Sequence, residues 1–147
     1  MVTNNMKAGL LSKRWLRIAV VGVLYFVVGY GSTFFDAPGP GLHFVRLAAW
    51  VASAAVYIVH LAYEHFRLES APATTAVNVA VAVAIGGFLL AVGATTHAAM
   101  VSDHAPYRRF VIALIAWPLI TGVPAFLVTI VIAMALRWLK IPARARH

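Results

Sequence analysis

The chain has 147 residues, of which 63% are hydrophobic and only 11% are charged. A soluble domain has roughly 45–50% apolar and about 25% charged residues, so this composition excludes an ordinary water-soluble globule and indicates a protein solvated by lipid. The 12 Lys and Arg outnumber the 4 Asp and Glu, which gives a formal net charge of +8, and there is no cysteine. The lack of cysteine excludes disulfides, thiolate nucleophiles and Cys-ligated metal centres.

Four apolar segments are long enough to cross a bilayer, whose hydrocarbon core takes about 20 helical residues. The expected spans are about 18–35, 43–66, 73–100 and 110–136. The connecting segments are short, and DAPGPG and LESAP have the composition of turns. Helices joined by short loops pack as antiparallel neighbours. The sequence therefore predicts an all-α integral membrane protein with a single domain, in which four transmembrane helices form an up-down bundle.

The first span permits a second interpretation, because the basic segment KRWLR before it resembles the start of a cleaved signal peptide. The apolar run is longer than is usual for such a peptide, however, and small or aromatic residues recur in it at helical spacing, namely Gly22, Tyr25, Gly29 and Ser32. This repeat predicts a packed helix face. Small residues at the same spacing in the third span, Ala82-xxx-Gly86 and Gly87-xxx-Ala91, predict close helix contacts within a tight bundle or an oligomer.

The basic residues are distributed unequally between the two ends of the predicted helices. Nine of the 12 lie in residues 1–17, between the second and third spans, or in residues 137–147. The positive-inside rule therefore predicts that both termini are cytoplasmic and that the protein lies in the cell membrane. We expect the basic tails 1–17 and 137–147 to contact anionic lipid headgroups. Because this bias accounts for most of the net charge, no nucleic-acid partner is expected.

The second span carries polar or aromatic residues at alternating spacings of three and four. These residues are His43, Arg46, Trp50, Ser53, Tyr57, His60, Glu64 and Arg67, and together they are called the polar face. At 1.5 Å per residue the polar face is about 36 Å long, enough to reach from one side of the bilayer to the other. Ionisable groups avoid lipid, so the second helix is predicted to be the buried, organising helix. Asn78 of the third span is expected at the depth of His60 and is predicted to hydrogen-bond to it.

Two interpretations of the polar face remain open. In the first, its side chains only hydrogen-bond the helices together. In the second, it lines a cavity, a proton path or a ligand pocket, with Arg46, Ser53, Tyr57, His60, Glu64 and Asn78 as the candidate residues. The preferred functional hypothesis is an accessory or scaffold subunit, or a small transport-type bundle, without a cofactor and within a homo-oligomer or a larger membrane complex.

The histidines support a different hypothesis, in which the protein is a redox subunit. His43 and His97, and possibly His60, are candidate axial ligands of a b-type haem. Alternatively, Asp36, His43, His97, Asp103 and His104 supply nitrogen and oxygen ligands for a divalent metal on the outer face. A third hypothesis is a membrane enzyme in which Glu64 and His60 act as an acid–base pair.

Overall fold

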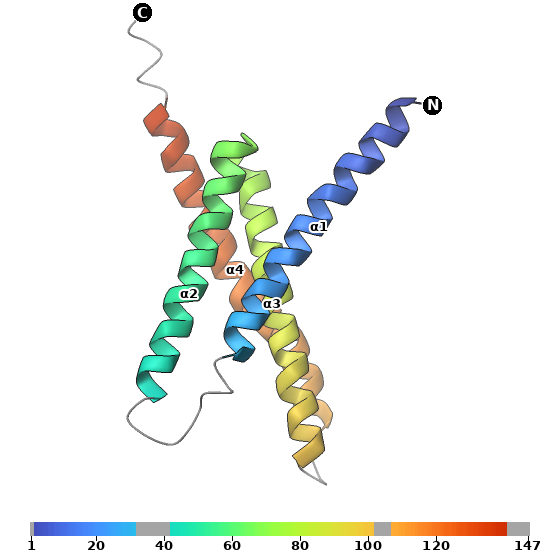
Figure 1. The fold of residues 1–147 in the computed structure, drawn as a ribbon, viewed down its shortest axis with the longest axis vertical. Coiled ribbons are helices and arrows are strands. Elements are labelled where there is room, and N and C mark those ends of the chain that lie inside the picture. Colours follow the sequence, from blue (N-terminus) through green and yellow to red (C-terminus); the bar gives the residue numbers. More distant parts are fainter. Residues whose placement is uncertain (1, 32–41, 102–106, 141–147) are drawn as a thin grey trace, which may run out of the picture.

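The computed structural model describes residues 2–31, 42–101 and 107–140, which form four long helices and one π-helical turn (Figure 1). The elements are α1 (Val2–Gly31), α2 (Leu42–Ala62), η2 (Tyr63–Arg67), α3 (Pro72–Val101) and α4 (Tyr107–Lys140). Four stretches are long and apolar enough to cross a membrane, namely Ser12–Gly31, His43–Arg67, Pro72–Val101 and Arg108–Leu139. The prediction of four apolar helices of membrane-spanning length is therefore confirmed.

The first helix is longer than its predicted span. It begins at Val2, so residues 2–17, which were assigned to a basic tail, are helical. The segment 141–147 lies outside the described residues, as do Ser32 of the predicted helix face and Asp36, Asp103 and His104 of the predicted metal site.

α3 is the central helix of the bundle. In α3, 8 of the 30 residues are buried, whereas among the residues of α2 whose burial is described only His60 and Leu61 are buried. α3 packs along both α1 and α4, whereas α2 meets its neighbours over a much smaller area (Figure 1). The prediction that the second helix is the buried, organising helix is therefore wrong. The N-terminal half of α2 presents large side chains such as Phe44 and Trp50, which are 75% and 77% exposed.

Glycines on two faces of α3 explain its central position. On one face, a Cβ added at Gly86 would lie 2.5 Å from Tyr25 Cβ of α1, and one added at Gly22 of α1 would lie 2.6 Å from Ile85 Cγ2. On the other face, a Cβ at Gly87 would lie 2.6 Å from Thr121 Oγ1 of α4. These separations are too short for real Cβ atoms, so only glycine permits the observed approach. The predicted close packing through small residues is confirmed.

Residue pairs at these contacts give the relative directions of the helices. Along α1, Gly22 meets Ile85 and Gly29 meets Leu90, so α1 and α3 run in the same direction. Along α4, Gly87 meets Thr121 whereas Ala84 meets Gly122, so α3 and α4 run in opposite directions. The core where α1 meets α3 contains the buried residues Ile18, Tyr25 and Ala82.

Enlarging Gly86 tests the close contact between α1 and α3. We expect Gly86→Ala to lower the free energy of unfolding by about 1–3 kcal/mol, because the added methyl overpacks the contact with Tyr25. Gly31→Ala is the matched control, since no atom lies within 4 Å of a Cβ added there. The measurement is unfolding in mixed detergent micelles. Equal stabilities of the two variants would contradict the packing described.

Candidate functional site

The second membrane-spanning helix ends in a π-helical turn that closes over the side chain of Glu64. The Leu68 N–H donates to the Tyr63 carbonyl at 3.3 Å, five residues back along the chain. Glu69 then adopts a left-handed backbone with φ of 48°, which reverses the chain and lets the Ser70 N–H donate to the Glu64 carbonyl at 3.3 Å. π-helical turns are frequent at functional sites. Here the turn buries two consecutive residues, Glu64 and His65.

The Glu64 carboxylate is 1% exposed and is held by two hydrogen-bond donors. Its Oε2 accepts from Asn78 Nδ2 at 2.9 Å and from Ser70 Oγ at 3.2 Å. The Asn78 Oδ1 in turn accepts from Arg14 of α1, at 2.9 Å from Nε and 2.6 Å from Nη2. One buried amide therefore links α1, η2 and α3. Hydrogen bonds to charged groups are about twice as strong as neutral ones, so this link is a strong one.

His60 lies beside this cluster without joining it. The ring is buried, and its Nε2 lies 3.9 Å from Glu64 Oε1, beyond hydrogen-bonding distance. Neither ring nitrogen has a hydrogen-bond partner among the described residues. Asn78 does not donate to His60 as expected, because its amide nitrogen is taken by the carboxylate, a stronger acceptor. Direct proton exchange between His60 and Glu64 would require the two groups to approach by roughly an ångström.

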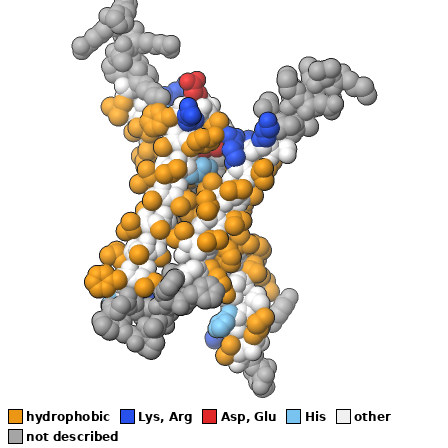
Figure 2. Space-filling model, viewed as in Figure 1, with side chains coloured by type: hydrophobic (Ala, Val, Ile, Leu, Met, Phe, Trp, Pro, Cys, Tyr) orange, Lys and Arg blue, Asp and Glu red, His pale blue; other side chains and the backbone are white. Residues whose placement is uncertain are grey.

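A groove of about 620 Å³ lies between α1 and α2 beside this cluster. Its length is lined by apolar side chains, Leu16, Val20 and Leu24 of α1 and Ala55, Val56 and Val59 of α2. Its other lining residues include Arg17, His60, Tyr63 and Glu64. These residues lie at one end of the groove, because α1 and α2 run in opposite directions (Figure 1). Figure 2 shows basic, acidic and histidine side chains gathered where these two helices diverge. The groove thus combines an apolar wall with a charged end.

The structure divides the predicted polar face into two parts. Tyr57 contacts α4, where its hydroxyl lies 2.6 Å from Thr129 Oγ1, and His60 and Glu64 are buried further along. Toward the other end, Ser53 is half-buried, and His43 and Arg46 are exposed. Helical spacing put all of these residues on one face, but no described helix covers the half of that face nearer the N-terminus of α2. The structure therefore brings His60, Glu64 and Asn78 together, and leaves Arg46 and Ser53 apart from them.

The predicted haem and metal ligands that the structure describes, His43, His60 and His97, do not form one site. His97 is exposed beside a cavity of about 580 Å³ that Tyr30 and Trp117 also line. No residue of α2 lines this cavity, so His43 is not part of it. In the described ranges, no three His, Cys, Asp or Glu side chains are placed to hold a metal ion.

Sequence reasoning missed Arg14, Arg17, His65 and Ser70. The two arginines were assigned to a basic tail, although the sequence held a signal for Arg14. It shares a helical face with Ile18 and Tyr25, both of which are buried against α3. His65 could not have been found by helical spacing, because the π-helical turn alters the register after Ala62. Ser70 reaches Glu64 only through the left-handed backbone of Glu69.

A comparison of the chain with protein-family models, with curated proteins and with solved structures finds no match.

Removing the buried amide tests the link between the three helices. We expect Asn78→Leu to lower the free energy of unfolding by about 1–3 kcal/mol, because Glu64 and Arg14 both lose a hydrogen-bond partner. Adding Glu64→Gln to this variant should restore part of the loss, since it removes the buried charge. Thr96→Val is the control, because Thr96 is exposed and its hydroxyl bonds only within α3. If Asn78→Leu were as stable as this control, the amide would not hold the site together.

Proposed function

We propose that the protein is a small accessory or transport-type bundle of the cell membrane that binds a membrane amphiphile in the groove between α1 and α2. The observation that carries this proposal is the groove itself. Its volume of about 620 Å³ lies in the range of roughly 300–1,000 Å³ typical of ligand sites. Its apolar walls suit a hydrocarbon chain, and its charged end suits a polar headgroup. Both features come from one pair of loosely packed helices.

The proposed arrangement in the membrane is an up-down bundle with both termini in the cytoplasm. It is supported by the basic residues, nine of which would then lie on the cytoplasmic side, and by the alternating directions of the contacting helices. The charged end of the groove would then lie near the cytoplasmic interface, where a lipid headgroup resides. The basic tails would contact anionic headgroups nearby.

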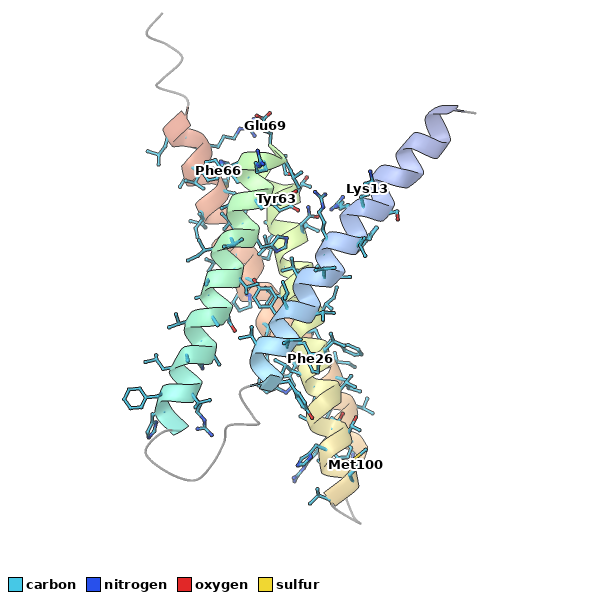
Figure 3. All side chains as sticks on the ribbon, in the orientation of Figure 1. Lys13, Phe26, Tyr63, Phe66, Glu69 and Met100 are labelled. Carbon is cyan, nitrogen blue, oxygen red and sulfur yellow. The ribbon has the colours of Figure 1, made fainter. Side chains whose placement is uncertain are left out.

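Single cysteines test this arrangement, because the natural chain contains none. Ala71→Cys and Met100→Cys form a matched pair of neutral substitutions at exposed positions near opposite ends of α3, and Met100 is marked in Figure 3. We expect a membrane-impermeant maleimide to label Met100→Cys in intact cells and Ala71→Cys only after permeabilisation. The reverse pattern would contradict cytoplasmic termini, and labelling of both in intact cells would contradict a spanning α3.

Photolabelling tests the binding site. A phosphatidylglycerol with a diazirine in its acyl chain is expected to label residues 16–24 and 55–64 of the protein in vesicles. Ala55→Trp places an indole in the groove and should reduce this labelling about tenfold. Ala54→Trp is the control, because Ala54 is the neighbouring exposed residue of α2 and does not line the groove. Peptide mapping by mass spectrometry gives the readout. Even labelling along the lipid-exposed faces of all helices, unchanged by Ala55→Trp, would contradict the proposal.

A further inference from the structure

Two side chains at the charged end of the groove have buried nitrogens that lack hydrogen-bond partners among the described residues. His60 is 6% exposed, and neither of its ring nitrogens has a hydrogen-bond partner in the described ranges. The buried Nε of Arg17 likewise has no partner there. Both residues line the groove. Since buried polar groups are normally hydrogen-bonded, two such groups at one place indicate a missing acceptor.

The charges at this end do not balance. Glu64 is engaged by Asn78 and Ser70, and Asn78 also holds Arg14, so the charges of Glu64 and Arg14 are joined through one amide. Arg17 forms no ion pair with any described carboxylate, and the 3.9 Å contact between Glu64 and His60 would be an ion pair only with a protonated imidazole. Two arginines against one carboxylate leave one positive charge in excess. An uncompensated cation is costly within a membrane-spanning helix, and a bound anion would offset that cost.

The length of the groove favours a flexible chain over a packed helix. From Leu16 to Leu24 of α1 the helix rises about 12 Å. A partner transmembrane helix would need contacts over much of a core about 30 Å thick. An acyl chain attached to a headgroup at Arg17 and His60 would instead follow the apolar residues away from the interface. The dimensions of the groove thus favour a lipid with one charged end over a packed helix.

We infer that the groove selects an amphiphile with an anionic oxygen headgroup, whose oxygens accept hydrogen bonds from Arg17 and His60. This inference rests on the proposed function and specifies its ligand. In either neutral tautomer the His60 ring has one N–H to donate, and Arg17 supplies the positive charge. Glu64 forms no ion pair with Arg17: its Oε2 accepts from Asn78 and Ser70, and its Oε1 lies nearest to His60, at 3.9 Å. The shared chemistry covers carboxylates and phosphates, and the lipid is the source proposed.

Three photoreactive lipids with identical acyl chains test the headgroup preference: phosphatidic acid, phosphatidylcholine and diacylglycerol. We expect phosphatidic acid to label the groove about tenfold more efficiently than diacylglycerol, which has no anionic oxygen to accept charge-assisted hydrogen bonds. Phosphatidylcholine should lie between the two, because its phosphate keeps acceptor oxygens but its charge is balanced by the choline cation. Arg17→Gln should reduce this preference to within about twofold. Lys13→Gln is the matched control, because Lys13 is an exposed cation of α1 that does not line the groove (Figure 3). His60→Gln should weaken the preference independently, and covers the case in which Arg17→Gln fails to fold.

Several outcomes would overturn the inference, and they separate it from the proposed function. Equal labelling of the groove by all three lipids would refute anion selectivity while leaving amphiphile binding intact. Failure of every lipid to label the groove would refute both. An equal effect of Lys13→Gln and Arg17→Gln would show a diffuse surface attraction, which 0.5 M salt would also abolish. Competition by inorganic phosphate, but not by chloride at equal ionic strength, would identify a free anion as the ligand. A disulfide-linked dimer of Val20→Cys would identify a second copy of the chain as the occupant.

Discussion

Close packing of α3 against both α1 and α4 is the constraint on which the rest of the structure depends. Gly86 and Gly87 stand next to each other in the chain but serve contacts with different helices, Tyr25 of α1 and Thr121 of α4. In lipid, helix association draws on this kind of backbone approach, because apolar surface gains little by leaving a hydrocarbon solvent. Three helices are thereby fixed as a unit, and α2 is left at the edge. The groove between α1 and α2 is a consequence of that division.

α2 is attached to this unit by two polar contacts and by a small apolar contact, in which Val56 and Tyr57 pack against the core. One contact joins Glu64 to Asn78, and a second joins the Tyr57 hydroxyl to Thr129. Hydrogen bonds fix position and orientation without requiring continuous surface contact. They therefore hold α2 near α1 while leaving space between the two helices. Arg17 and His60, which have polar nitrogens without a hydrogen-bond partner among the described residues, line that space, and this is why we propose the ligand site there.

The sequence predicted the apolar helices and their close contacts because hydropathy and small-residue spacing are local signals. It also identified Glu64, His60 and Asn78 as residues that lipid would not solvate. It could not show which helix is central, because that depends on which helices pack against the faces formed by small residues. Helical periodicity correctly placed the polar residues of the second span on one face. Burial of the half of that face nearer the N-terminus of α2 would also have needed a neighbouring helix. His65 and Ser70 depended on the π-helical turn and on a left-handed residue, neither of which has a reliable sequence signal.

The adjacency of Gly86 and Gly87 also bears on how this sequence can change over evolutionary time. Substitutions at the two positions disturb different interfaces, so no single change in one partner helix can compensate for both. Asn78 and Glu64 would have to change together, or not at all. In the N-terminal half of α2, by contrast, Phe44 and Trp50 are exposed, so we expect other large apolar residues to replace them with little effect on the packing. Divergent relatives of this chain should therefore be aligned through α3, even where the sequence of α2 is no longer similar.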